Sequence, residues 1–113
     1  MGLARALIRV GVVFRAQQIL DLVRVGVELQ PLLVGRLRDA VASDAHALQP
    51  LADTVDALLR RREQVVDLLR GEVLTIPGGL GVRATSTLSA LMFFYLLSDI
   101  KDLHIHEEIM APV

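Results

Sequence analysis

The pattern of apolar and polar positions divides the chain into helical segments separated by recognisable breaks. Over residues 3–42, charged and amide side chains form a narrow stripe at steps of three to four residues, and apolar side chains cover most of the remaining circumference. Pro31 lacks a backbone N–H and clashes with the preceding helical turn, so we expect the first helix to end near Gln30. Residues 31–42 are then predicted to form a second, shorter helix.

The clearest helical pattern begins at Pro50 and continues to Arg70. Proline suits the first helical position because its missing N–H has no intrahelical acceptor there, and Gly71 follows where a left-handed cap is expected. Arg62 interrupts an otherwise regular row of apolar residues at 4-3-7-4 spacing, which is typical of one side of a helical hairpin. This row consists of Leu51, Val55, Leu58, Val65 and Leu69.

The segment between residues 72 and 85 has a different character. Residues 73–76 and 80–83 are β-prone and flank a Pro-Gly-Gly turn at 77–79, so they predict either a short β-ribbon or an irregular loop. A ribbon this small is marginal alone and must pack on the helices or pair with another chain. Ser86 or Thr87 can then begin a last helix that runs to about Glu108.

These elements predict one all-α domain over residues 1–113. We expect about four helices in an antiparallel bundle, with the Gly-rich loop or short ribbon before the last helix. The first half of that last helix, residues 88–97, is apolar on nearly every side, which is typical of a helix surrounded by other structure.

Composition changes this picture in one respect, because the chain is unusually apolar for its size. Hydrophobic residues make up 53% of the 113 residues, whereas aromatic residues make up only 4%. A chain of this length buries only about two thirds of its unfolded surface when it folds alone. A single copy is therefore expected to leave a contiguous apolar patch in water, and such patches usually mark an interface.

Charge and cysteine content exclude several classes of function. The formal net charge of -1 gives no overall basic surface for nucleic acid, so we expect no nucleic-acid partner. The absence of cysteine excludes disulfides, thiolate catalysis and Cys-ligated metals. Six arginines against two acids give residues 1–38 a charge of +4, while one lysine against four acids gives residues 84–113 a charge of -3. These two segments could complement each other within one subunit or between subunits.

A membrane-spanning segment is not expected. The longest uncharged run, residues 84–98, would reach about 22 Å as a helix, which is short of the roughly 30 Å hydrocarbon core of a bilayer. The apolar stretch at residues 3–14 contains two arginines and has no cleavage-site pattern, so it does not read as a signal peptide. We expect a cytoplasmic protein, with association at a membrane surface as the alternative.

Candidate catalytic and ligand-binding chemistry is sparse. His104 and Glu108 share a helix face whereas His106 points away, and two ligands do not complete a metal site, so we expect no metal, no cofactor and no catalytic residue. Arg83, Ser86 and Thr87 lie at the start of the last helix, where free N–H groups favour anions. The glycine spacing before them is not that of a phosphate-binding loop, and ordinary turn and N-cap chemistry explains them equally well.

The sequence therefore favours a non-enzymatic helical interaction or scaffold protein. We expect it to self-associate, or to serve as a small subunit of a larger assembly, through aliphatic helix faces. The alternative is a protein that binds a membrane surface or a hydrophobic small molecule such as a lipid or isoprenoid. The residues predicted to form the buried interface are Leu51, Val55, Leu58, Val65, Leu69, Leu88, Leu91, Phe94, Tyr95 and Leu97.

Overall fold

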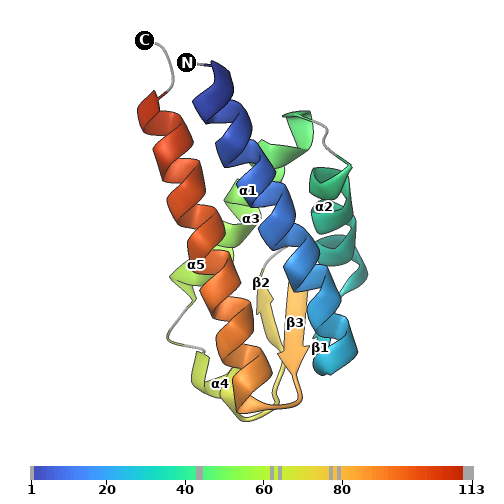
Figure 1. Cartoon of the computed structure of the whole chain (residues 1–113). Helices are drawn as coiled ribbons and strands as arrows, with labels where there is room; N and C mark the ends of the chain where they lie inside the picture. Colours follow the sequence, from blue (N-terminus) through green and yellow to red (C-terminus); the bar gives the residue numbers. More distant parts are fainter. Residues whose placement is uncertain are drawn as a thin grey trace.

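Two long helices form one layer of the molecule, as seen in the computed structural model, which describes residues 2–42, 45–61, 63, 65–76, 78 and 80–110. Helices α1 (Gly2–Asp21) and α5 (Thr87–Met110) lie side by side and run in opposite directions, so the start of α1 lies near the end of α5 (Figure 1). The second layer contains helix α3 (Leu48–Arg60), with helix α2 (Pro31–Val41) and a small sheet beside it. The molecule measures 44 × 25 × 25 Å.

The predicted break at Pro31 is confirmed, because Pro31 is the first residue of α2 (Pro31–Val41). The first helix, however, ends at Asp21 and not near Gln30. A 3-10 turn (Leu22–Val25) follows, then Gly26 with a left-handed φ of 106°, and then strand β1 (Val27–Leu29). Residues 27–29 leave the helix because their backbone pairs with a strand more than fifty residues later, and Val27 becomes buried there.

Of the two alternatives for residues 72–85, a short β-ribbon and an irregular loop, the structure contains the ribbon, which belongs to a larger sheet. Strand β3 (Leu80–Ala84) lies in the centre, with β2 (Leu74–Ile76) and β1 antiparallel on its two sides. The chain continues this pairing beyond β1, since the N–H of Gln30 donates to the carbonyl of Gly81 at 2.9 Å. Pro77 and Gly79 of the predicted turn lie outside the described residues. The sheet packs on the helices, one of the two ways predicted to stabilise the ribbon.

The prediction of a single helix over residues 50–70 is wrong. Helix α3 (Leu48–Arg60) follows a short 3-10 turn (Ala45–Ala47) and ends ten residues early, and a five-residue helix, α4 (Val65–Leu69), comes after it. The physical reason is burial, because α4 as a separate helix places Leu68 fully inside the core, whereas Leu69 of the predicted row is 37% exposed. Arg62, where that row is interrupted, lies outside the described residues.

Both predicted capping positions are confirmed by hydrogen bonds. Gly71 has a φ of 81°, and its N–H and that of Glu72 donate to the carbonyls of Leu68 and Asp67 at 3.1 and 2.9 Å, a Schellman motif at the end of α4. At the start of α5, the N–H of Ser89 donates to Oγ of Ser86 at 3.1 Å.

The hydrophobic core lies between the two layers. The helical character of the fold is as predicted, but the four-helix bundle is not, because the described chain contains five α-helices and a three-stranded sheet. The sheet takes up part of the volume that a fourth full-length helix would fill. The core is built mainly on Val12, Ala16, Ile19, Leu33, Leu37, Leu51, Leu58, Leu74, Val82, Phe93, Leu97 and Ile100.

Candidate interaction surface

The predicted interface residues fall into two groups in the structure. Leu51, Val55, Leu58 and Leu97 are buried in the core of the chain itself, which leaves them no surface to offer to another molecule. Val65 and Phe94 are half-buried, and the ring of Phe94 packs edge-to-face on that of Phe93. The other predicted residues are exposed, namely Leu69, Leu88, Leu91 and Tyr95.

A row of exposed apolar side chains runs along α1. None of its members is among the predicted interface residues. We call Leu3, Leu7, Val10 and Phe14 the α1 outer row; each of these side chains is between 58% and 74% exposed. Their 4-3-4 spacing is that of a coiled-coil seam, so they form one straight stripe on the helix. The spacing is readable in the sequence, but the sequence alone does not tell this stripe from the opposite face, which carries Val12, Ala16 and Ile19 into the core.

Two arginines of α1 lie beside the α1 outer row and pair with acidic residues of α5, and the guanidinium of Arg15 also lies over the ring of Phe14, 5.8 Å from its centroid. Nε of Arg9 contacts Oε1 of Glu107 at 3.0 Å, and Nε of Arg15 contacts Oδ2 of Asp99 at 3.6 Å, so both side chains reach across to α5. By helical spacing Arg5 lies on the inner side of the helix, and its Nε atom is buried. Helix α1 therefore exposes a continuous apolar row on its outer face, while the partly exposed Arg9 and Arg15 lie at the flanks of this row.

An exposed row also follows α5, interrupted by two polar residues. Leu88, Leu91 and Tyr95 occupy its first half and are between 53% and 71% exposed. Ser98 and Asp102 continue the same 3-4 spacing, and the exposed Ile105 and Ile109 complete it. We call the five apolar members of this stripe the α5 outer row.

The two outer rows belong to the same layer of the molecule. The contacts Arg15–Asp99 and Arg9–Glu107 show that α1 and α5 pair along much of their length, in the antiparallel arrangement seen in Figure 1. The described chain has sixteen exposed large apolar side chains. Four of them lie on α1 and six on α5, the sixth on α5 being Met92. Exposed apolar surface is therefore concentrated on the α1–α5 layer.

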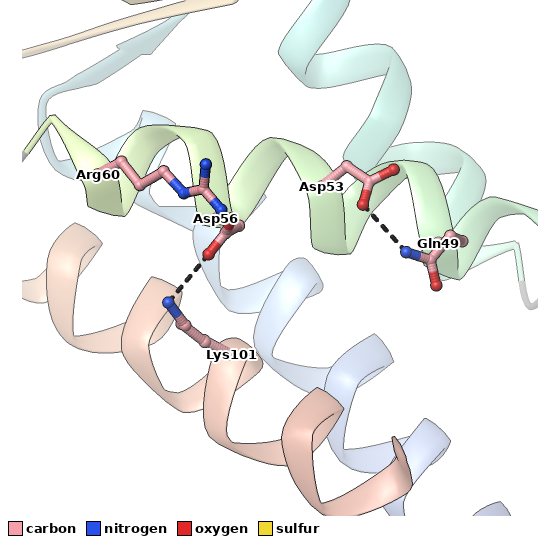
Figure 2. Close-up of polar contacts among 5 residues, drawn as sticks. All are labelled: Gln49, Asp53, Asp56, Arg60 and Lys101. Carbon is pink, nitrogen blue, oxygen red and sulfur yellow. Dashed lines mark hydrogen bonds and ion pairs between the residues drawn. The ribbon is translucent and has the colours of Figure 1, made fainter. Parts of the chain in front are cut away.

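The opposite charges of the first and last segments thus meet within one subunit. A further ion pair joins α5 to α3: Nζ of Lys101 donates to Oδ1 of Asp56 at 2.9 Å, and Arg60 contacts Oδ2 of the same carboxylate at 2.9 Å (Figure 2). The hydrogen bond from Lys101 is the main reason why the pKa of Asp56 lies below its ordinary value. Figure 2 also shows Gln49 donating to Asp53 on the same helix, at 3.0 Å. The Lys101–Asp56 contact joins α3 to α5, whereas the contacts of Arg60 and Gln49 lie within α3.

Four of the residues considered for ligand chemistry, His104, Glu108, Arg83 and Ser86, form contacts within the chain. His104 and Glu108 share a face as predicted, and Nε2 of His104 lies 3.1 Å from Oε1 of Glu108. Within the described parts of the chain, no group of three or more His, Asp or Glu side chains is placed to hold a metal ion. Of the predicted anion-binding residues, Arg83 donates from Nε to the carbonyl of Gly71 at 2.8 Å, Ser86 caps α5, and Thr87 is the first residue of that helix.

No helix among the described residues combines the length and the apolar content that crossing a lipid bilayer requires. Comparison with known proteins gives no assignment either: no protein-family model matches the sequence, and no significant match is found among curated proteins or among solved structures. A functional proposal must therefore be argued from the surface itself.

Proposed function

We propose that this chain is a non-enzymatic helical assembly subunit that self-associates through the outer faces of α1 and α5. The observation that carries the proposal is the exposed apolar row on α1, formed by Leu3, Leu7, Val10 and Phe14, in the same layer as the α5 outer row. Such an arrangement leaves apolar surface in water unless another molecule covers it.

The size of the layer supports a stable contact between two copies. The long side of the molecule measures 44 × 25 Å, and a standard interface buries about 800 Å² on each partner. The coiled-coil spacing of the α1 outer row suits packing against another helix. A two-fold contact between identical layers would bury both copies of each row at once, and this is the commonest symmetry of soluble oligomers.

The ion pairs of Arg9 and Arg15, two of the three arginines of α1, favour a protein partner over a membrane surface. Helices that bind anionic bilayers carry Lys and Arg on their polar faces, where they reach the lipid headgroups. In α1, Arg9 and Arg15 are engaged by Glu107 and Asp99 of the same chain. Flotation with liposomes that contain acidic lipid tests the membrane alternative, and we expect the protein to remain in the unfloated fraction.

The proposal predicts that charges placed on the outer rows dissociate the assembly. Light scattering after size-exclusion chromatography should give a mass larger than 12.4 kDa for the parent and the monomer mass for Leu7→Glu and Leu91→Glu. Both residues are more than half exposed, so these variants should fold normally. A parent protein that is monomeric at every concentration tested would contradict the proposal.

A matched control comes from another face of the molecule. Leu32 on α2 is 56% exposed, comparable to Leu91, but lies outside the α1–α5 layer. Leu32→Glu should therefore keep the oligomeric mass of the parent. Equal dissociation by Leu32→Glu and Leu7→Glu would show that added charge, and not the α1–α5 layer, controls assembly. Leu58 is unsuitable for such a test, because a charge at this fully buried position would unfold the chain.

A further inference from the structure

A groove of about 460 Å³ runs along the first half of α1 toward the beginning of α3. Its size falls within the range of small-molecule binding sites, which is about 300–1,000 Å³. Most of its wall is apolar, with two arginines among the lining residues. The lining consists of Gly2, Arg5, Ala6, Arg9, Val10, Val13 and Leu48.

Arg5 is the feature of this groove that the fold itself does not explain. The Nε atom of Arg5 is buried and has no hydrogen-bond partner within the described chain. Arg5 also forms no ion pair with another described residue. Arg9, the second cation of the groove, is already neutralised by Glu107 at 3.0 Å. Because Arg5 lines the groove and has no ion-pair partner within the described chain, its guanidinium is left to pair with an anion that enters the groove.

The apolar wall specifies the rest of the ligand. Val10, Val13 and Leu48 provide aliphatic surface without a hydrogen-bonding side chain, and Ala6 leaves the space open between them. A guanidinium pairs with carboxylate or phosphate through two parallel hydrogen bonds, whereas an alkyl chain gains from contact with the aliphatic wall. The two halves of the groove therefore match the two halves of one amphiphilic molecule.

We propose that this groove binds a single-chain amphiphile with an anionic headgroup, whose carboxylate or phosphate pairs with Arg5. The site is separate from the proposed assembly function, because it depends on Arg5 and the inner flank of α1. Val10 alone belongs both to the groove and to the α1 outer row, so binding should be measured in the parent and again in Leu7→Glu. This comparison keeps the result independent of whether the chain self-associates.

Isothermal titration calorimetry with sodium decanoate and with decyl phosphate, both below their micelle concentrations, tests the proposal and distinguishes the two headgroups. We expect saturable binding of at least one of them at one molecule per chain. Shortening the chain from decanoate to octanoate should weaken binding about fourfold for each methylene group lost from the wall. Decyltrimethylammonium, which has the same chain and a cationic head, should not bind.

Variants separate the headgroup contact from a general charge effect. Arg5→Gln should weaken binding of the anionic amphiphile at least tenfold. The far-UV circular dichroism of this variant should match that of the parent, because Arg5 forms no ion pair within the described chain. Arg70→Gln, at an exposed arginine outside the groove, is the matched control and should bind like the parent. Ala6→Glu places a carboxylate at an exposed position in the groove and should abolish binding.

Three outcomes would overturn the proposal. One is the absence of saturable binding of both decanoate and decyl phosphate to the parent and to Leu7→Glu. Another is an equal loss of affinity in Arg5→Gln and Arg70→Gln, which would indicate only a long-range charge effect. The third is binding of decyltrimethylammonium as tight as that of decanoate, because the headgroup would then play no part.

Discussion

At the scale of single residues, Asp56 joins two helices that are far apart in the sequence. Its carboxylate contacts Lys101 on α5 and Arg60 on its own helix, and these contacts lower its pKa. A carboxyl group whose pKa is lower in the folded state stabilises the fold above its unfolded pKa, and this contribution is lost as the pH falls through the folded value.

Asp56→Asn should therefore lower the free energy of unfolding at pH 7 by up to about 1 kcal/mol, the range of partly exposed ion pairs. The difference from the parent should shrink as the pH falls below about 4, where the carboxyl group becomes protonated. Urea denaturation between pH 7 and pH 2 measures both effects. Asp39→Asn, at an exposed carboxylate on α2, is the control and should change little at any pH; a pH-independent cost for Asp56→Asn would contradict this explanation.

Gly26 shows how one residue determines where α1 gives way to the sheet. Its φ of 106° is unfavourable for other residues, and an added Cβ would overlap Oγ1 of Thr85. Gly26→Ala is expected to reduce the free energy of unfolding by about 2–3 kcal/mol in urea denaturation.

Gly35 is a glycine at which, unlike Gly26, an added side chain should stabilise the fold. It lies inside α2, where an added Cβ meets no atom within 4 Å. Gly35→Ala should increase the free energy of unfolding by up to about 1 kcal/mol, because alanine has the higher helix propensity. A similar loss of stability in both variants would show that the left-handed backbone at Gly26 is not the cause.

At the scale of elements, the separation of α3 from α4 determines which leucine enters the core. Leu68 is fully buried and Leu69 is 37% exposed, whereas the seam spacing in the sequence favours Leu69. Leu68→Ala should cost about 2–5 kcal/mol of unfolding free energy, as other buried Leu→Ala changes do.

Leu69→Ala should cost less than about 1 kcal/mol, because its side chain loses less contact on truncation. The two variants remove the same atoms from adjacent positions, so chemical denaturation of the pair compares burial alone. If Leu69→Ala proves the more damaging of the two, residues 50–70 form the continuous helix that the sequence pattern predicts, and the arrangement of α4 described above is incorrect.

At the scale of the whole molecule, the α1–α5 layer determines how the chain meets its surroundings. If two copies cover each other's outer rows, assembly stabilises the folded state by mass action. The thermal midpoint of the parent should then rise by a few degrees for each tenfold increase in protein concentration, as measured by circular dichroism. The midpoint of Leu7→Glu should be independent of concentration; a parent midpoint that is also independent would count against the proposed assembly.

Local signals in the sequence determined the features that depend on neighbouring residues. Pro31 starts a helix because its ring blocks the helix that precedes it, and Gly71 and Ser86 cap helix ends. For residues 72–85 the local signals predict only a ribbon or a loop, and pairing with β1 and packing on the helices decide for the ribbon. The large apolar fraction also follows from composition alone, and with it the expectation that apolar surface remains exposed.

The tertiary structure alone decided the features that depend on distant partners. Residues 27–29 leave the helical pattern because β3 offers them backbone hydrogen bonds, and α4 turns so that Leu68 reaches the core. On α1 and α5, apolar residues surround much of each helix, so periodicity alone does not choose the face that packs inward. That choice is made by packing against the other layer, and it leaves Leu3, Leu7, Val10 and Phe14 in the solvent.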